Sequence, residues 1–366
     1  MLAETDVLIV GAGIVGLAHA AEALRRGNRV TVIDRDSRAV GASVRNFGHC
    51  CITAQSGELL QLAQVARERW LHYSELAGFF SVESGAITVA RNAEELAVLD
   101  ELSASRERGQ VRLVDAATVR DELSSNDRQI VGGAVLRDDL RVDPREAVGS
   151  LATWLQSHGV RFLWRTSYLG HDGDAITSRG SIRAGRTIVC VGHDLDYLEP
   201  ALSIEHAIER CGLQMARVEA PGSRRIARAV LTGTSMLRYP AFTETDAAAA
   251  LRERVSSEDP GLVAVGANVM FTQRPDGTII AGDSHRSDDT MDPFLAEATT
   301  ELLLRRIGEV LGEVNLRVVE RWQGVYASSA QHPYLIADLG QGVSAVSVTS
   351  GVGMTISFGL AARAFA

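Results

Sequence analysis

Asp6-Val-Leu-Ile-Val-Gly-Ala-Gly-Ile-Val-Gly16 is the stretch that decides the fold of this chain. The apolar run from Val7 to Val10 predicts a buried parallel strand, and it leads directly into the glycine turn at residues 11–16. A segment suited to a helix follows and ends at Gly27, and a second apolar strand, from Arg29 to Ile33, ends beside Asp34. Strand, glycine turn, helix, strand and acid in this order are typical of a dinucleotide-binding βαβ unit.

The glycines and the acid of this unit each have a physical role. Gly11 permits the tight turn, Gly13 lets a pyrophosphate approach the backbone, and Gly16 lets the helix lie close to the strand. The helix start at Ile14 and Val15 offers free N–H groups and a positive dipole end to phosphates. Asp34 can accept a hydrogen bond from a ribose 2′-hydroxyl, and its charge disfavours a 2′-phosphate, although Arg35 beside it weakens that exclusion. The motif alone does not distinguish FAD from NAD.

The composition is that of an ordinary globular protein. The 366 residues are 46% hydrophobic and 23% charged, and the formal net charge of −9 gives no support to nucleic-acid binding. We find no leader sequence and no uncharged apolar span of about 18 residues, so we expect a cytoplasmic protein that does not bind a membrane. The four cysteines lack metal-ligand spacing, so we expect reduced thiols and no metal: Cys50, Cys51, Cys190 and Cys211.

Periodicity and turn signals organise the remaining chain. Helices are predicted at residues 58–76, 93–108, 116–123, 145–158 and 294–311, and strands at residues 86–90, 131–142, 160–164, 187–192, 316–320 and 343–348. Asp143-Pro144 marks the start of the fourth helix, as N-cap and first-turn residue. Residues 209–282 are predicted to be β-rich, with strands at 262–272 and 278–281 around the hairpin turn Pro275-Asp-Gly277.

Dinucleotide-type elements therefore occur at the start, in the middle and at the end of the chain. This pattern predicts an α/β (α+β) fold with a discontinuous Rossmann-like domain made of residues 1–78, 143–205 and 322–366. A β-rich substrate domain, residues 79–142 and 206–321, is interleaved with it.

Five motifs in this order resemble the FAD-dependent oxidoreductases typified by D-amino-acid oxidase, glycine oxidase and sarcosine oxidase. They are the glycine turn with Asp34, the loop from Gly41 to Gly48, the Val142-Asp-Pro144 helix start, the strand ending at Gly192, and Ser350-Gly-Val-Gly-Met-Thr355. The resemblance covers essentially the whole chain and implies that the dinucleotide is FAD.

The resemblance also implies residue roles. Gly11, Gly13 and Gly16 would face the pyrophosphate and Asp34 the adenosine ribose. The loop would run along the pyrophosphate toward the isoalloxazine and place His49 near the ring. A backbone contact at Tyr168 would meet adenine. The full set implied for the cofactor is Gly11, Gly13, Ile14, Val15, Gly16, Asp34, Arg35, Ser43, Arg45, Asn46, Phe47, Gly48, His49, Tyr168, Gly192, Gly351, Gly353, Met354 and Thr355, the last four at the pyrimidine end of the flavin.

Several strings resemble a branch of this family associated with phosphonate catabolism. They are Ser43-Val-Arg-Asn-Phe-Gly48, Arg238-Tyr-Pro240, Arg274-Pro-Asp-Gly277, Gly282-Asp-Ser-His285 and Arg321-Trp-Gln-Gly-Val-Tyr326. The activity that this resemblance implies is oxidation of an aminophosphonate related to 2-aminoethylphosphonate.

One position departs from the family pattern. Amino-acid oxidases of this family usually carry Trp-x-Gly-x-Arg, whose arginine binds the substrate α-carboxylate in a bidentate manner. Here Tyr326 stands at the position of that arginine, and a phenol supplies only a neutral hydrogen bond. An ordinary α-amino acid is therefore disfavoured, and a substrate with a tetrahedral or differently placed acid group is favoured.

The expected reaction removes a hydride equivalent from the carbon next to an amine, so no obligatory catalytic base is required. His49 and Tyr326 are candidates for a catalytic role. Substrate-binding candidates are Arg45, Tyr239, His285, Arg321, Gln323 and Tyr326, whereas Arg238 and Arg274 are expected to be solvated at hairpin ends. Either oxygen or another acceptor takes the electrons.

Three alternatives remain at this stage. A glycine or sarcosine-type oxidase would hold its carboxylate with Arg45 or Arg321. An NAD-dependent dehydrogenase of hydroxyl groups is disfavoured by the C-terminal glycine motif. A flavoprotein without catalytic activity would bind FAD that no amine reduces.

Overall fold

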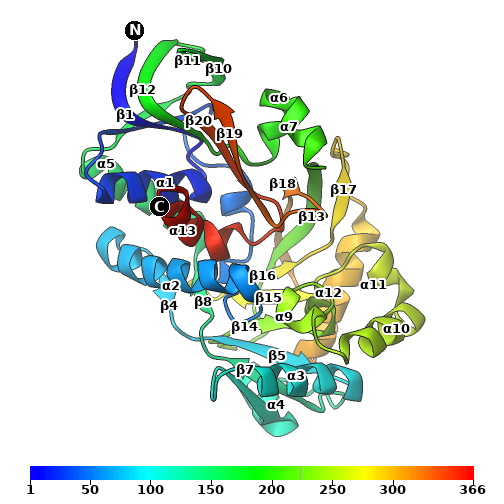
Figure 1. The fold of residues 1–366 in the computed structure, drawn as a ribbon. Helices are drawn as coiled ribbons and strands as arrows, with labels where there is room; N and C mark the ends of the chain where they lie inside the picture. Colours follow the sequence, from blue (N-terminus) through cyan, green and yellow to red (C-terminus); the bar gives the residue numbers. More distant parts are fainter. Residues whose placement is uncertain (223) are drawn as a thin grey trace.

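The computed structural model describes residues 1–222 and 224–366. Two large sheets and a small one form the framework (Figure 1), and the chain passes between the two large sheets several times. None of the helices in the described residues is long and apolar enough to cross a membrane.

The first sheet contains the predicted βαβ unit. Its parallel strands lie in the order β9-β2-β1-β12-β20. Two antiparallel pairs, β10 with β11 and β19 with β20, extend it. The bounds are β1 Ala3–Val10, β2 Val30–Asp34, β9 Arg161–Trp164, β10 Tyr168–Asp172, β11 Asp174–Thr177, β12 Gly180–Val189, β19 Tyr334–Gly340 and β20 Val343–Val348.

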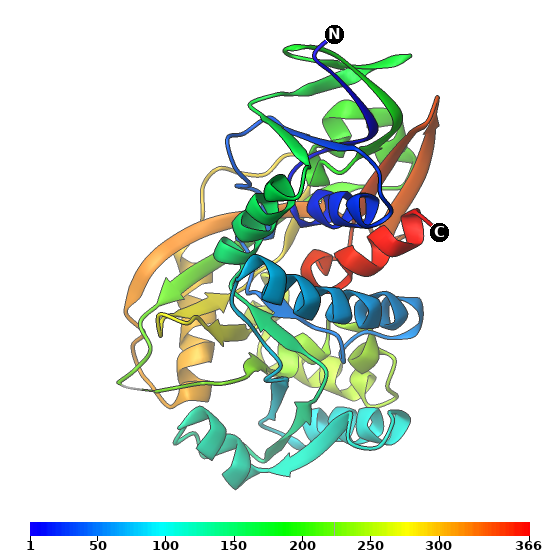
Figure 2. The ribbon, with the colours of Figure 1, turned by 90° about the vertical axis from the view of Figure 1, so that its left-hand side faces the viewer.

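Helices from distant parts of the chain pack together below this sheet. The C-terminal helix α13 (Gly353–Ala364) lies between α1 (Ile14–Arg25) and α2 (Gly57–Ala77), as Figure 2 shows. Trp70 of α2 is fully buried and packs edge-on against Phe358 of α13. Helix α5 (Pro144–Ser157) completes this layer, and Asp143 caps it as predicted. Shorter helices lie near the edge of the sheet: α6 Leu195–Leu198, α7 Pro200–Glu205 and the 3₁₀ turns at 42–44 and 192–194.

The second sheet is mostly antiparallel, in the order β17-β13-β16-β15-β14-β5-β7-β6, and β18 pairs along β13. Side chains alternate between its two faces: Met270 and Phe271 enter different core clusters. The bounds are β5 Ala86–Ala90, β6 Val111–Asp115, β7 Gly132–Leu136, β13 Glu209–Val218, β14 Ala229–Leu231, β15 Met270–Gln273, β16 Ile279–Gly282, β17 Arg286–Asp288 and β18 Val318–Ser328.

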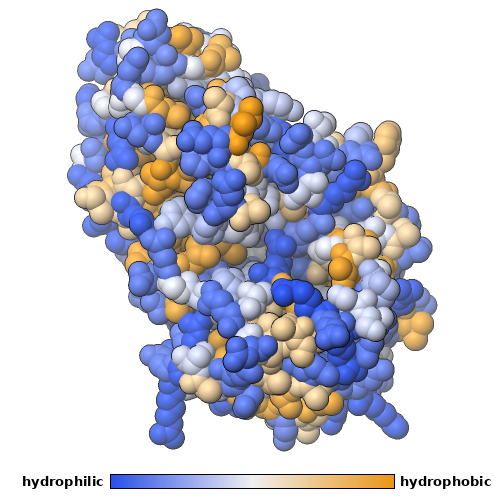
Figure 3. Space-filling model, turned by 45° about the vertical axis from the view of Figure 1, so that its right-hand side comes forward, coloured by the Kyte–Doolittle hydropathy of each residue, from blue (hydrophilic) through white to orange (hydrophobic). Residues whose placement is uncertain are grey.

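Helices cover both faces of the second sheet. Helices α4 (Ala116–Leu123), α11 (Pro260–Ala264) and α12 (Glu297–Leu311) pack on the face of Phe271. Helices α3 (Ala93–Ser105), α8 (Gly233–Met236), α9 (Pro240–Thr243) and α10 (Ala248–Glu258) pack on the other face. On the side of the molecule drawn in Figure 3, the exposed apolar side chains form small separate groups, as is usual for a protein surface.

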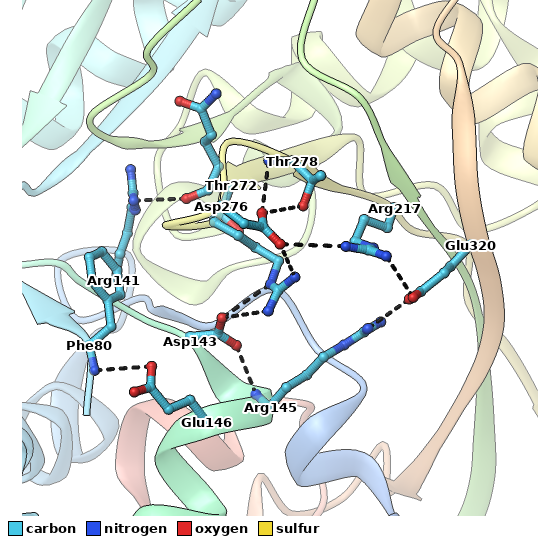
Figure 4. Close-up of polar contacts among 12 residues, drawn as sticks. Phe80, Arg141, Asp143, Arg145, Glu146, Arg217, Thr272, Asp276, Thr278 and Glu320 are labelled. Atoms are coloured by element: carbon cyan, nitrogen blue, oxygen red, sulfur yellow. Dashed lines mark hydrogen bonds and ion pairs between the residues drawn. The ribbon is translucent and has the colours of Figure 1, made fainter. Parts of the chain in front are cut away.

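A polar network joins the start of α5, which packs below the first sheet, to the second sheet (Figure 4). Asp143, at the start of α5, accepts hydrogen bonds from Nε and Nη2 of Arg274 at 3.1 and 2.8 Å. Glu320 of β18 accepts bonds of 2.7 Å from both Arg145 and Arg217. Arg274, which we expected to be solvated, is therefore held between these segments.

The small sheet, β3 (His49–Cys50), β8 (Leu140–Val142) and β4 (Ser81–Val82), lies at the same junction. The mixed α/β fold is as predicted. The division into two domains at the boundaries given above remains a prediction, and the boundary at residue 322 falls inside β18.

Some local predictions were wrong. The section containing residues 233–264 was expected to be β-rich apart from a helix around residues 247–250, but it forms four helices, of which only α10 matches that expected helix. The strand predicted from 262 starts only at Met270. Thr232 and Ser235 form a capping box for α8, and Pro240 and Pro260 occupy the first turns of α9 and α11. The helix predicted from 294 begins at 297 because the Asp292 side chain accepts a hydrogen bond from the amide of Phe294, which forms a turn there.

Candidate functional site

One cavity of about 390 Å³ is lined by residues from both large sheets and from both ends of the chain. At one end it meets the carboxyl ends of β1 and β2, where ligands bind in open α/β sheets. At the other end it meets β18, the segment after β16 and the turn after α8.

The glycine turn between β1 and α1 leaves space that no other residue would leave. Gly11 has φ +102°, and a Cβ atom there would lie 2.4 Å from the carbonyl oxygen of Cys190. A Cβ atom on Gly16 would lie 1.9 Å from the carbonyl oxygen of Gly11, so helix and turn could not approach as they do. Gly13 is the N-cap of α1 and supplies no capping side chain, and the amide of Ile14 donates to Ser43 Oγ at 2.9 Å. This helix start faces the cavity and suits a phosphate group.

The end of the cavity next to β2 carries the predicted ribose acceptor. Asp34 lines the cavity and accepts bonds from the amides of Ala12 and Asp36 at 2.7 and 2.9 Å. Burial raises the pKa of Asp34 above its ordinary value, although these two amides oppose the shift. Arg35 forms an ion pair with Asp194 at 2.7 Å, so its charge is already partnered.

A second helix start meets the cavity at the end of the chain. Gly351, with φ +77°, and Gly353, at the start of α13, line the cavity, and no side chain caps this helix. A Cβ atom on Gly351 would lie 3.2 Å from the Tyr326 hydroxyl and 3.4 Å from Nη2 of Arg238. Gly351 therefore joins the helix-start region to the polar cluster at the far end.

That polar cluster was only partly anticipated. Nη2 of Arg238 donates a hydrogen bond of 2.7 Å to the Tyr326 hydroxyl. Although burial disfavours its charge, Tyr326 and Asp283 raise the pKa of Arg238, and burial raises the pKa of Tyr326. The site thus presents a cationic guanidinium and a neutral phenol. Tyr239, Asn268, Asp283 and His285 line the same part of the cavity.

The family model described as FAD dependent oxidoreductase, DAO, matches residues 6–366. The chain belongs to the DAO family of FAD-dependent oxidoreductases. Its cofactor is FAD, and the cavity fits this group, because the glycine turn, the two uncapped helix starts and Asp34 all face it.

Solved structures share this fold over nearly the whole chain. Glycine oxidase from Geobacillus kaustophilus is 18% identical with a TM-score of 0.79, covering 98% of this chain and 94% of that one. L-α-glycerophosphate oxidase from Mycoplasma pneumoniae, with FAD bound, is 17% identical with a TM-score of 0.78, covering 99% and 94%. Iminodiacetate oxidase from Chelativorans sp. BNC1 is 19% identical with a TM-score of 0.75, covering 96% and 92%. A search of curated proteins gave no match.

Most residues that we expected to bind FAD line the cavity of this DAO-family protein. They are Gly11, Gly13, Ile14, Val15, Asp34, Arg35, Ser43, Arg45, Asn46, Phe47, Tyr168, Gly192, Gly351, Gly353 and Met354. Gly16, Gly48, His49 and Thr355 do not line it. Gly16 and Gly48 permit close backbone packing, and Thr355 Oγ1 accepts a bond from the amide of Cys51 at 3.0 Å. These four residues therefore support the segments that line the cavity and do not face it themselves.

His49 does not line the cavity, and its ring pairs instead with the buried Asp139. Its Nε2 lies 2.7 Å from Oδ2 of Asp139, and both side chains are buried. Cys51 lies close enough for the three residues to offer ligand atoms within 4.8 Å of one another, which the sequence spacing did not indicate. Burial raises the pKa of the Cys51 thiol well above its ordinary value, so it is protonated and a poor metal ligand. All four cysteines are free and buried.

The substrate-binding candidates divide into two groups. Tyr239, His285, Tyr326 and Arg45 line the cavity, and Arg45 Nη1 donates to the Gln323 carbonyl at 3.1 Å. Arg321 and Gln323 do not line it: Arg321 pairs with Glu297 at the surface at 2.6 Å, and the Gln323 amide donates to the Asp292 carbonyl at 3.1 Å. Arg238, which we expected to be solvated, and Asp283, which was not a candidate, lie inside the cavity instead.

The sequence held weak signals for both residues. Each belongs to a string that supported the family resemblance, Arg238-Tyr-Pro240 and Gly282-Asp-Ser-His285. Arg238 and Asp283 come together only in the folded protein, because Arg238 follows α8 and Asp283 follows β16, and the pairing of strands in the second sheet brings these two segments close.

Proposed function

We propose that the protein catalyses FAD-dependent oxidation of a small primary or secondary amine that carries an acid group. The product is an imine, which hydrolyses to an aldehyde or ketone. The substrate that we favour is an aminophosphonate related to 2-aminoethylphosphonate. Oxygen or another acceptor then takes the electrons.

The observation that carries this proposal is the position of Arg238. The usual family arginine is replaced by Tyr326, yet a guanidinium reaches the same part of the cavity from a different segment and touches that tyrosine. Among the described residues, neither Arg238 nor Arg45 forms an ion pair with a carboxylate, although both line the cavity. Asp283 is the acidic group near Arg238, but the two form no ion pair within 4.0 Å, and a buried cation in that position favours binding of an anion.

The two arginines contact the same strand. The guanidinium of Arg45 donates from Nη1 to the Gln323 carbonyl at 3.1 Å, and that of Arg238 donates to the Tyr326 hydroxyl, three residues further along β18. Three residues span about 10 Å of strand. A phosphonate, with up to two negative charges and three oxygens, can accept hydrogen bonds from several donors at once. Two guanidinium groups that line the same cavity suit the two negative charges of a phosphonate better than the single charge of a carboxylate.

When bound, FAD accepts the hydride equivalent that leaves the carbon next to the amine. The protein holds the substrate by its acid group at Arg238, and the Tyr326 hydroxyl fixes the orientation of that guanidinium. Tyr239 and Tyr326 line the space beside it with aromatic rings, which limits the access of water. The proteins of similar structure are named for related molecules. Glycine and iminodiacetate are amines with acid groups, and glycerophosphate carries a phosphate.

A glycine or sarcosine-type amino-acid oxidase is the second candidate. Arg45 lies inside the cavity and could hold a carboxylate, whereas Arg321 is paired at the surface. The lost bidentate arginine of the Trp-x-Gly-x-Arg motif weighs against this candidate.

Anaerobic titration of the purified holoprotein tests the proposal. We expect the flavin absorbance to bleach on addition of an aminophosphonate and to bleach far less with glycine or sarcosine. Bleaching by glycine or sarcosine alone would refute the aminophosphonate proposal and favour the amino-acid oxidase. A yellow protein that no amine bleaches would mean a flavoprotein without this activity, and a colourless protein that uses NAD would refute the cofactor assignment.

A further inference from the structure

We propose that Asp283 forms the subsite for the substrate's ammonium group and accepts the proton that this group loses before oxidation. The inference rests on the proposed amine oxidation. It gives a catalytic role to a carboxylate that so far has only an electrostatic effect on Arg238.

Asp283 lies in the cavity and has an unused oxygen. It follows β16 directly and lines the cavity together with Arg238 and Tyr326. The residue is only 3% exposed, and Oδ1 has no hydrogen-bond partner among the described residues. A buried carboxylate oxygen without a donor costs free energy unless a ligand supplies that donor. An ammonium group, with three N–H donors and a positive charge, supplies it.

His285 makes the surroundings of Asp283 suitable for a proton. Its Nδ1 lies 2.9 Å from the carbonyl oxygen of Gly266, which can only accept, so Nδ1 carries the hydrogen. Burial lowers the pKa of His285 well below its ordinary value, so the ring is neutral. Its Nε2 therefore presents a lone pair to Oδ2 of Asp283, 3.7 Å away. A lone pair facing this oxygen disfavours the carboxylate and favours the carboxylic acid.

Burial, rather than the charges around it, brings the pKa of Asp283 toward neutral pH. Burial raises the pKa of Asp283 to about 7, while the positive charge of Arg238 and a hydrogen bond from Asn268 oppose the shift. The titratable or charged groups that face it, from β13, the turn after α8, β18 and its own segment, are Cys211, Arg238, Tyr239, Tyr326 and His285. Arg238 is the one cation in this set. Asp283 is therefore neutral below about pH 7 and a carboxylate above it.

The proton transfer balances. One N–H bond of the substrate ammonium breaks, and an O–H bond forms on Asp283, which leaves a neutral amine with a free lone pair. Loss of a hydride equivalent from the adjacent carbon then converts the C–N single bond into the double bond of a protonated imine. Water adds to this protonated imine and releases an ammonium or alkylammonium ion together with the carbonyl product.

The two charged residues also define selectivity. Arg238 binds the anionic end of the substrate and Asp283 its ammonium end, so the cavity recognises a molecule with opposite charges at its two ends. A neutral amine without an acid group loses the first contact, and an acid without an amine loses the second.

The test is the pH dependence of anaerobic flavin reduction at saturating substrate, measured on the holoenzyme by stopped flow. In the wild type, the rate should rise through a pKa near 7, far below the pKa of a free alkylamine, which is near that of Lys, about 10. D283N should bind FAD, react about 10²-fold more slowly at pH 7.5, and gain rate only as the amine itself deprotonates. D283E should restore part of the rate and a step below pH 9. D100N, an exposed carboxylate on α3 outside the cavity, is the matched control and should keep the wild-type profile.

The outcomes separate this inference from the proposed function. If an aminophosphonate reduces the wild type but the rate follows only the free amine, with no step near pH 7, the inference fails and the function stands. The same holds if D283N keeps the wild-type rate and profile. If D283N does not retain FAD, the pH profiles of the wild type and of D283E test the inference: a step near pH 7 in the wild type supports it, and its absence refutes it. If no amine reduces the flavin at any pH, both proposals fail together.

Discussion

Nη2 of Arg238 and the hydroxyl of Tyr326 lie 2.7 Å apart. The cation of the site therefore comes from a different segment of the chain than in the family motif. The family motif Trp-x-Gly-x-Arg would place a guanidinium on β18 itself. Here β18 contributes a phenol, and the guanidinium comes from the turn after α8. The cation is present but comes from a different segment, so an anion bound there would be approached from a different direction than in the family motif.

Replacement of Arg238 should weaken substrate binding. Methionine preserves much of the side-chain volume but removes the charge, and a hydrogen bond to a charged group contributes about 1.5–3 kcal/mol. For R238M we expect the KM for an aminophosphonate to rise about 10- to 100-fold, measured by steady-state kinetics on FAD-loaded protein. Y326F, which loses only the neutral donor, should show a rise of about 3- to 10-fold. If R238M leaves KM unchanged while R45M raises it, the anion lies at Arg45 instead.

A methyl group on Gly16 should abolish cofactor binding. Its Cβ would lie 1.9 Å from the Gly11 carbonyl oxygen, so α1 must move away from the turn that holds the phosphates. We expect purified G16A to be nearly colourless and to regain little flavin absorbance with added FAD. Gly149 is the matched control, because it lies in α5 with no atom within 4 Å of a Cβ position. G149A should keep FAD and gain about 0.5–1 kcal/mol in the free energy of unfolding. A yellow, stable G16A would contradict the account of the turn.

Arg274 should stabilise the junction between the two large sheets. Its partner Asp143 has a side chain only 5% exposed, so removal of the cation leaves a buried carboxylate that keeps the hydrogen bond from the Arg145 amide but loses its ion pair. For R274M we expect a loss of about 3 kcal/mol in the free energy of unfolding by denaturant titration. The control is R317M, whose pair with Glu219 lies at the surface and contributes about 0–1 kcal/mol. Equal effects of the two substitutions would show that the junction does not depend on this pair.

Acid should destabilise the protein in part through His19. Burial lowers the pKa of this α1 histidine to about 4, from an ordinary value of 6.5, and its Nδ1 lies 2.7 Å from the Val15 carbonyl. The unfolded chain binds the proton between these values and the folded chain does not. Stability from this group is therefore complete above pH 6.5 and is lost as the pH falls toward 4, by about 3 kcal/mol.

The variant H19N tests this pH dependence because asparagine cannot titrate, whereas its amide can still donate to the Val15 carbonyl. Between pH 7 and pH 4, the free energy of unfolding of H19N should fall by about 3 kcal/mol less than that of the wild type, with FAD in excess. All other titrating groups are common to both proteins. Parallel pH curves would refute the role of His19.

The cofactor half of the protein could be predicted because its signals are local. Glycine spacing, an apolar strand and an acid define the βαβ unit within about thirty residues, and Asp143-Pro144 marks α5 in two residues. The resemblance to the family then supplied FAD and the C-terminal glycines. The βαβ unit and the start of α5 are determined by residues that are close together in the sequence.

The substrate end could not be predicted in the same way. Arg238 looked like a solvated arginine because nothing near it in the sequence reveals Tyr326, eighty-eight residues away. His49 lies beside the loop that lines the cavity, yet its ring pairs with Asp139 behind that loop. Apart from the helix expected around residues 247–250, the section containing residues 233–264 was predicted to be β-rich, and the capping box and the prolines make α8, α9 and α11 helical instead. In each instance a contact distant in sequence, or a local cap, decided the outcome.

The most direct test of the central claim is a crystal structure of the FAD-loaded protein with a phosphonate that has no amine to oxidise, such as ethylphosphonate. We predict that phosphonate oxygens lie within hydrogen-bonding distance, about 3 Å, of the Arg238 guanidinium and the Tyr326 hydroxyl. The Asp283 carboxyl group should face the free end of the ligand. A phosphonate bound away from Arg238, whether at Arg45 alone or outside the cavity, would contradict the account.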